Sequence, residues 1–430
     1  MRRARRAIVS FVLSVLAALL VARAARRGVP VVLGPHVDRS GEPASTSAPS
    51  ATPPAASSSA RPARGAPTGR VSEGPPSMFH LDPRRTNRSP FRAPRAPVVR
   101  RRTRLRGPIA AAPAVAGELT LAASLGGDIV ALGADGRVAW RHDARARVYG
   151  SPLVQGGLVI FGVDGGEVLA LSTARGHVKW RARVEGDADT GAATLGGDAL
   201  VLSAGRASYA WTKAGKQRWR HTSKKKRYAA PAVADDGLVV LGGQDDHLVA
   251  VDANGRESWS VDLGADVDCA PAIGDDGVIF AATDGGEVFA LEPATGRLRW
   301  RARVPGRVRG GLSVARDGAV LVATLGPAPT VLALDPRTGE VWLRHEVRGT
   351  GSPEQGVVGA PLESADGALV FGTQSDEVIA LDREGRRLWT FDAGADVDLA
   401  VVLVADGALL VGTEAGELIE LVDAPSPSSP

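Results

Sequence analysis

Short apolar runs separated by polar turns fill most of this chain. In residues 230–263, four runs rich in Val, Leu and Ile alternate with Asp-Asp-Gly, Gln-Asp-Asp and Ala-Asn-Gly turns. Runs of this length, bounded by turn residues, predict β-strands joined as hairpins. They are too short and too β-branched to favour helices. Because almost every residue in them is apolar, we expect the sheets to be covered on both faces.

The strand pattern repeats along the chain with a tryptophan near its end. Seven of the eight tryptophans are spaced by 40, 39, 40, 41, 42 and 47 residues, and an Ala step precedes each: Trp140, Trp180, Trp219, Trp259, Trp300, Trp342 and Trp389. A period near forty with four strands per unit predicts the blades of a β-propeller. We expect each Trp to lie on the outermost strand, where neighbouring blades diverge and a large ring is needed to fill the gap.

The two ends of the repeat array are incomplete, and together they predict eight blades. The last unit, within residues 398–424, has three strands and no Trp, and residues 98–108 contain one additional strand. An N-terminal strand that completes the last blade would remove two exposed sheet edges. The spacing places Arg101 where a Trp would stand, beside a blade gap that faces solvent. The predicted fold is therefore an all-β, eight-bladed propeller with four-stranded blades.

Two motifs resemble a known family. ALEPATGRLRW (residues 290–300) and ALSTARGHVKW (residues 170–180) match the Ala-x-Asp-x-x-x-Gly-x-x-x-Trp repeat of quinoprotein-like propellers, with Glu292 and Ser172 at the Asp position. MFHLDPRRTNRSPFRAP (residues 78–94) is similar to the Asp-Pro-x-x-Thr-Gly-Arg-Ser-Pro segment that precedes such propellers, with Asn87 in place of Gly. The resemblance covers about three quarters of the chain and implies a fold; function does not follow from fold.

The chain outside the repeats divides by composition. A basic start, an apolar stretch at residues 7–22 and Ala22-Arg23-Ala24 make residues 1–24 a signal peptide; an uncleaved anchor at residues 7–22 is the alternative. Residues 25–75 are a predicted disordered linker rich in Pro, Ala and Ser, and residues 76–108 are a basic lead-in with the closing strand. The propeller spans residues 109–424, and residues 425–430 are a disordered tail.

Charge is distributed unevenly between these regions. Residues 1–108 hold 21 Arg and 4 acidic residues, a net charge of +17, whereas the rest of the chain has a net charge of −12. The propeller is thus acidic, which argues against a nucleic-acid partner. The local lysine cluster SKKKRY (residues 223–228) is interpreted as a solvated loop. We expect an exported monomer in the periplasm or at the cell surface, with inner-membrane anchoring as the alternative.

Catalytic signals are weak. The family's quinone-dependent dehydrogenases typically use a carboxylate cluster, a Trp platform and, in many, a disulfide of adjacent cysteines; this chain contains one cysteine, Cys269. The seven histidines are scattered, with no pair at metal-ligand spacing. We therefore predict no catalytic residue, no metal and no cofactor. A quinone- or carbohydrate-related ligand-binding protein, or a degenerate quinoprotein dehydrogenase, is the alternative.

The loops that enter successive blades carry charges of alternating sign. We expect these loops to open on one face around the channel and to form a docking surface for an envelope protein or polypeptide. The alternative is that neighbouring loops only form salt bridges with one another. The candidate residues are Arg147, Tyr149, Asp187, Asp189, Lys226, Tyr228, Asp266, Asp268, Arg307, Arg309, Glu354, Asp396 and Asp398. The predicted function is that of a non-catalytic scaffold in the cell envelope.

Overall fold

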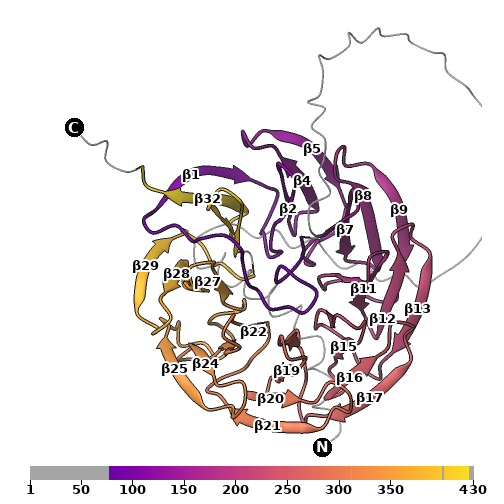
Figure 1. The fold of residues 1–430 in the computed structure, drawn as a ribbon. Coiled ribbons are helices and arrows are strands. Elements are labelled where there is room, and N and C mark those ends of the chain that lie inside the picture. Colours follow the sequence, from indigo (N-terminus) through magenta and orange to yellow (C-terminus); the bar gives the residue numbers. More distant parts are fainter. Residues whose placement is uncertain (1–76, 311, 400, 426–430) are drawn as a thin grey trace, which may run out of the picture. The chain divides into compact units, whose positions relative to one another are not determined.

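The computed structural model describes residues 77–310, 312–399 and 401–425, and every regular element among them is a β-strand (Figure 1). These strands form eight sheets of four strands each, arranged around an axis. The prediction of an eight-bladed, all-β propeller is confirmed. The predicted signal or anchor (1–24), the linker (25–75) and all but the first residue of the predicted tail lie outside the described residues.

The first four blades follow one another in the chain, each running from its inner to its outer strand. Blade 1 contains β2 (Ala114–Ala116), β3 (Leu119–Ala123), β4 (Asp128–Leu132) and β5 (Val138–Asp143). Blade 2 contains β6 (Leu153–Gln155), β7 (Leu158–Val163), β8 (Glu167–Ser172) and β9 (Val178–Arg183). Blade 3 contains β10 (Ala193–Leu195), β11 (Ala199–Ala204), β12 (Ala207–Thr212) and β13 (Gln217–Thr222). Blade 4 contains β14 (Ala232–Val233), β15 (Val239–Gly242), β16 (His247–Val251) and β17 (Glu257–Asp262).

The remaining blades continue the ring, and the last takes a strand from each end of the array. Blade 5 contains β18 (Ala272–Ile273), β19 (Ile279–Ala282), β20 (Glu287–Leu291) and β21 (Leu298–Arg303). Blade 6 contains β22 (Leu312–Val314), β23 (Val320–Ala323), β24 (Thr330–Leu334) and β25 (Val341–Glu346). Blade 7 contains β26 (Leu362–Glu363), β27 (Leu369–Gly372), β28 (Glu377–Leu381) and β29 (Arg387–Asp392). Blade 8 contains β30 (Val401–Leu403), β31 (Leu409–Gly412), β32 (Glu417–Asp423) and β1 (Pro97–Arg104).

Blade 8 closes the ring in the predicted manner. β1 pairs antiparallel with β32, from Pro97 opposite Asp423 to Arg104 opposite Glu417. In Figure 1 the indigo β1 lies directly beside the yellow β32, so the two ends of the repeat array meet in one sheet. This pairing covers the outer edge of β32, which would otherwise be unpaired.

Six of the seven periodic tryptophans form one recurring inter-blade contact. Each indole Nε1 donates to a backbone carbonyl of the following blade or of the lead-in, at 2.7–3.0 Å. A glycine with positive φ lies against the ring in five of these contacts, as Gly296 does at Trp259. We call this arrangement the Trp socket. The predicted role of Trp as filler between diverging blades is confirmed for Trp140, Trp180, Trp219, Trp259, Trp300 and Trp389.

Trp342 is an exception, and its predicted place in the series was wrong. Ala333 pairs with Leu343, whereas the equivalent Ala290 pairs with Trp300. Leu343 therefore fills the gap against Gly385, and Trp342 occupies the bulged position and is 53% exposed. The physical reason is turn length: the socket residue always follows the turn glycine by four positions, and Trp342 follows Gly339 by only three.

Arg101 occupies the eighth socket, as the sequence predicts. An added Cβ on Gly136 would lie 2.0 Å from Nη1 of Arg101, in the way that other turn glycines abut indoles. The guanidinium also lies 3.4 Å from the carbonyl oxygen of Ala134, the equivalent of the Trp acceptor in other blades. The side chain is 27% exposed, against 8% for Trp300, so this blade gap is more open to solvent.

The lead-in crosses the ring before it reaches β1. We call residues 77–96 the strap. Backbone groups of the strap hydrogen-bond to the inner strands or their ends in blades 2, 4, 5, 6 and 7, through Ser77, Pro83, Arg84, Thr86, Asn87, Ser89 and Phe91. The indigo chain traverses the centre of the ring in Figure 1. Asn87 has a φ of +57°, which confirms that it takes the left-handed conformation expected of the family's Gly.

Within the described ranges, no helix has the length and apolar character needed to cross a membrane.

Candidate functional site

The predicted charged loops do lie on one face of the ring, because each is bonded to the same kind of turn. In six loops, the first charged residue accepts a backbone hydrogen bond from the turn between the second and third strands of the blade that the loop enters. Two examples are Asp164 N to Arg147 O at 3.0 Å and Asp284 N to Asp266 O at 3.0 Å. We call the thirteen predicted loop residues, together with these turns, the charged ring. In the GADVD loop that enters blade 5, the second aspartate is more buried than the first: Asp266 is half-buried, and Asp268 is 8% exposed.

The two GADVD loops create a repeated buried acid. Nε2 of Gln244 donates to Asp268 at 3.1 Å, and Nε2 of Gln374 donates to Asp398 at 3.0 Å. Burial raises the pKa of both aspartates, and the charge of Asp284 adds to the effect at Asp268, whose pKa reaches about 7. The predictions did not include either glutamine. Both follow a Gly-[Gly/Thr] step in the turn after the second strand, which is the signal that could have identified them.

Two other ring aspartates pair with acids of the neighbouring turns. Burial raises the pKa of Asp164 and of Asp189, and the nearby Asp164 carboxyl adds to the effect at Asp189, whose pKa reaches about 8. Burial and the nearby Asp246 carboxyl raise the pKa of Asp266 to about 6. Nearby carboxylates disfavour the charged form of one another. The charged ring therefore holds protons at pH values where exposed carboxyls are ionised.

Among the described residues, salt bridges of the charged ring gather around Glu354. Glu354, in the long loop before blade 7, accepts from Arg307 at 2.6 Å and from Arg309 at 3.3 Å. Arg309 also contacts Asp284 at 2.8 Å. Elsewhere, Lys226 lies over the ring of Tyr228, and Arg147 lies 3.5 Å from the hydroxyl of Tyr149. Asp187 accepts from the backbone of Gly165, and Asp396 is buried. Charges of neighbouring loops thus interact at Glu354, and Lys226 lies close enough to Asp187 and Asp189 to interact with them.

The strap fills the axis on the other side of the channel. Phe79 packs in one apolar cluster with Ala112, Ala230, Ala270 and Val402, which come from four different blades. Arg85 is fully buried, and its guanidinium donates to the backbone carbonyls of Phe79, Gly191, Ala192 and Pro231. Burial lowers the pKa of Arg85 to about 10, so it remains charged at neutral pH. The segment of residues 78–94 thus fills the central channel on this side, which the sequence did not predict.

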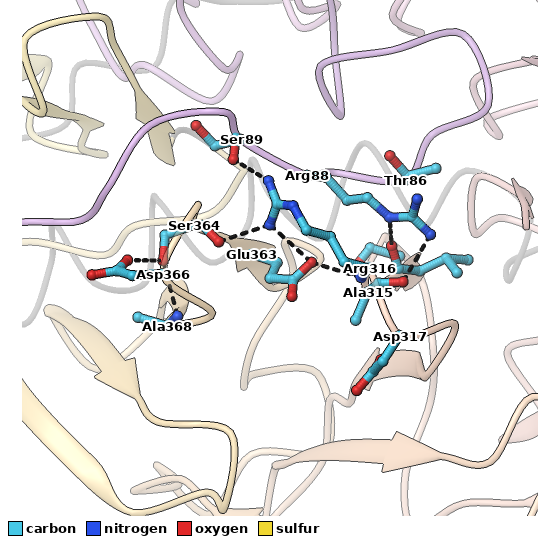
Figure 2. A network of polar contacts seen from close by, with 12 residues as sticks. Thr86, Arg88, Ser89, Ala315, Arg316, Asp317, Glu363, Ser364, Asp366 and Ala368 are labelled. Atoms are coloured by element: carbon cyan, nitrogen blue, oxygen red, sulfur yellow. Dashed lines mark hydrogen bonds and ion pairs between the residues drawn. The ribbon is translucent and has the colours of Figure 1, made fainter. Parts of the chain in front are cut away.

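A polar network fixes the strap to blades 6 and 7 (Figure 2). Arg88 donates to the carbonyls of Val314 and Ala315 at 2.8 and 2.7 Å. Arg316 reaches in the opposite direction, to the carbonyls of Ser89 and Ser364 and to the buried carboxylate of Glu363. Arg88 thus reaches from the strap to blade 6, and Arg316 reaches from blade 6 to the strap and to blade 7. The side chains of both arginines are half-buried, and that of Glu363 is buried.

The residues around the axis do not fit a quinone cofactor. A cavity beneath the strap, lined by His80, Asn87, Asp398 and neighbouring apolar residues, has a volume of about 20 Å³, room for about one water molecule. Cys269 is buried, and burial raises the pKa of its thiol, so it is an inert apolar residue there. Among the described residues, no three His, Cys, Asp or Glu side chains gather in a metal-binding arrangement.

Comparison with known proteins agrees with the blade pattern. The family model of the outer membrane protein assembly factor BamB matches residues 84–202, 182–266, 244–395 and 328–424, which together span the strap from residue 84 and all eight blades. The chain belongs to the BamB family. This confirms the resemblance to quinone-repeat propellers that the repeat and preface motifs indicate.

BamB proteins are also found among individual relatives. The chain is 28% identical over 221 residues to BamB of Burkholderia pseudomallei, covering 46% of this chain and 56% of that protein. The alignment thus spans about half the length of that relative. The chain is 29% identical over 316 residues to the serine/threonine-protein kinase AfsK of Streptomyces griseus, covering 60% of this chain and 37% of the kinase.

Solved structures place the fold among BamB proteins and quinoprotein enzymes alike. BamB from Moraxella catarrhalis superposes with a TM-score of 0.64 at 19% identity, covering 78% of this chain and all of that one. A quinohemoprotein alcohol dehydrogenase from Comamonas testosteroni superposes with a TM-score of 0.66 at 14% identity, covering 84% of this chain and 82% of the enzyme. At these identities the likeness concerns the fold alone.

Proposed function

We propose that this BamB-family propeller is a non-catalytic, exported scaffold of the cell envelope that docks a polypeptide partner on its charged ring. The observation that supports it best is the asymmetry of the channel. The strap fills the axis on one side with Phe79 and Arg85, while the other side presents the buried carboxyls of Asp268 and Asp398, each of which accepts a hydrogen bond from a glutamine. A partner that supplies positive charge would compensate these groups, which gives the docking specificity.

The enzymatic alternative has less support from this arrangement. The strap occupies the axis, and the cavity beneath it, about 20 Å³, is too small for a quinone. The dehydrogenase neighbours share the fold at 14% identity, which does not transfer a reaction. Family relatives that bear the name outer membrane protein assembly factor favour an assembly role in the envelope. We expect the scaffold to act as a monomer that is tethered or released on the outer side of the inner membrane.

A photo-cross-linking residue placed in the charged ring tests the proposal. It would replace Asp187 on the ring and, as a control, Ser260 on the outer strand β17, and cross-linked products would be recovered from intact cells of the source organism. We expect a discrete protein adduct from the ring position that is absent from the control. Equal adducts from both positions would contradict docking on this face.

Charge reversal then tests whether the ring sets specificity. Asp266→Lys changes a partly exposed ring carboxyl, and Lys179→Glu is the matched control on β9. Asp268 is unsuitable because a lysine at a site 8% exposed would disturb folding. We expect Asp266→Lys, and not the control, to abolish the adduct formed at the Asp187 position. An adduct unchanged by Asp266→Lys would remove the support for electrostatic recognition.

A further inference from the structure

A second concave surface lies at the outer seam between blades 7 and 8. This groove has a volume of about 500 Å³, and its lining includes none of the thirteen charged-ring loop residues. We call it the seam groove. Its lining residues come from the strap, the turn between β26 and β27, the turn between β28 and β29, and β29: Ala93, Pro94, Arg95, Asp366, Gly367, Ala368, Asp382, Arg383, Glu384, Leu388 and Trp389.

The seam groove is a consequence of ring closure. In blades 2 to 6, the Trp of the preceding blade packs against a hairpin turn that links the third and fourth strands. Blade 8 has no such hairpin, because its outer strand β1 comes from the other end of the array. The incoming strap supplies only the acceptor, the carbonyl of Pro94, which lies 2.7 Å from Nε1 of Trp389. The volume that a turn would fill remains open.

Apolar side chains contribute to the lining of the groove beside the charged ones. Leu388 occupies the bulged position of its outer strand and is 54% exposed. The same position holds small or charged residues in blades 1 to 5: Ala139, Lys179, Arg218, Ser258 and Arg299. Ala93, Pro94 and Trp389 add further apolar surface to the lining. Exposed apolar residues that gather at a concavity mark a binding surface.

Charge at the groove is unbalanced. Each of the three lining acids already has a partner: Asp366 accepts from Ser364 at 2.7 Å, and Arg386 contacts Asp382 at 2.6 Å and Glu384 at 2.9 Å. Arg383 lies 3.6 Å from the buried Glu363. Arg95 is exposed, and its guanidinium makes no hydrogen bond or ion pair with any described residue. Among the charged residues that line the groove, Arg95 is therefore the one without a described partner.

We propose that the seam groove binds an extended peptide segment of a partner protein. An apolar side chain of the peptide inserts between Leu388 and Pro94, and a carboxylate next to it in sequence pairs with Arg95. Apolar burial supplies affinity, and the single unpaired guanidinium selects an acidic neighbour over a basic one. This surface is independent of docking on the charged ring, so the failure of either proposal leaves the other untouched.

Selection from a random peptide library on the purified full chain tests this inference. We expect enriched peptides to contain an apolar residue next to Asp or Glu. For a synthetic peptide from the selection, fluorescence polarisation should show that Arg95→Glu weakens binding by about fivefold or more, and that Leu388→Asp abolishes it. Arg92→Glu, a matched exposed strap arginine outside the groove, should leave affinity unchanged. Exchanging the peptide's acid for Lys should restore binding to Arg95→Glu.

Three outcomes would overturn the proposal. The first is enrichment without the apolar-acidic pair, and the second is equal affinity of wild type and Arg95→Glu for the selected peptide. The third is self-association of the full chain, seen by sedimentation velocity and abolished by Leu388→Asp, because a second copy would then occupy the groove. All variants change exposed side chains, and an unchanged urea midpoint verifies that each is folded.

Discussion

Five of the six Trp sockets contain a glycine that has a positive φ and also leaves room for the indole. Gly296 has a φ of +68°, and an added Cβ would lie 2.6 Å from Cε3 of Trp259. Gly296→Ala therefore incurs a left-handed backbone cost of about 1–2 kcal/mol and displaces the indole at a further cost of about 1–3 kcal/mol. Gly264→Ala is the matched control, because Gly264 has a φ of +81° with nothing within 4 Å of the added Cβ.

We expect Gly296→Ala to lower the free energy of unfolding, measured by urea denaturation, by about 1–3 kcal/mol more than Gly264→Ala does. Equal losses in the two variants would show that the Trp sockets tolerate an added methyl group. At the residue scale, the sequence correctly predicts that six tryptophans fill gaps between blades and that Arg101 takes the eighth such position. It fails at Trp342 because a count of tryptophans ignores the turn glycine, which sets the register of the outer strand.

The strap is the element that joins blades far apart in the chain. Arg85→Ala removes four buried hydrogen bonds and leaves the carbonyls of Phe79, Gly191, Ala192 and Pro231 without donors. We expect a loss of at least about 3 kcal/mol in unfolding free energy. Arg92→Ala, an exposed change in the same strap, should stay within about 0.5 kcal/mol of wild type.

Hydrogen exchange distinguishes a loosened strap from general destabilisation. The amides of Val233, Ile273, Val314 and Glu363 donate to strap carbonyls. We expect them to exchange faster in Arg85→Ala, while amides of outer-strand pairs keep their protection. Equally faster amide exchange in all blades would contradict the expectation that the strap loosens independently of the blades. The sequence identifies this segment as a family motif, but its path across the axis depends on backbone hydrogen bonds with five blades, and no local pattern encodes such contacts.

At the scale of the whole molecule, buried carboxyls make stability depend on pH. Burial raises the pKa of Asp268 from its ordinary value of 3.8 to about 7. Between these values the folded state binds more protons than the unfolded state, so the free energy of unfolding falls as pH rises through that window. Asp398 shifts in the same direction for the same cause. The fold is thus expected to gain stability as pH falls from about 8 toward about 5.

Asp268→Asn should remove part of this dependence. We expect the variant to exceed wild type by about 1–4 kcal/mol near pH 8 and to approach it near pH 4, in urea unfolding at both pH values. Asp198→Asn, at an acid whose side chain is 79% exposed, is the control and should show no such divergence. A constant difference across pH would contradict the raised pKa. The sequence locates these acids on one face but misses their burial, because the turns of the neighbouring strands supply it.

The seam where β1 meets β32 also determines the order in which the ring is completed. Arg100 and Glu420 touch across that seam although they are 320 positions apart in the chain. Closing so long a loop is entropically expensive, and contacts of this kind form late in folding. The strand that leaves the ribosome ahead of all the others is therefore the last to acquire a neighbour. Until β1 pairs with β32, the outer edge of the eighth blade is unpaired and the ring is not closed.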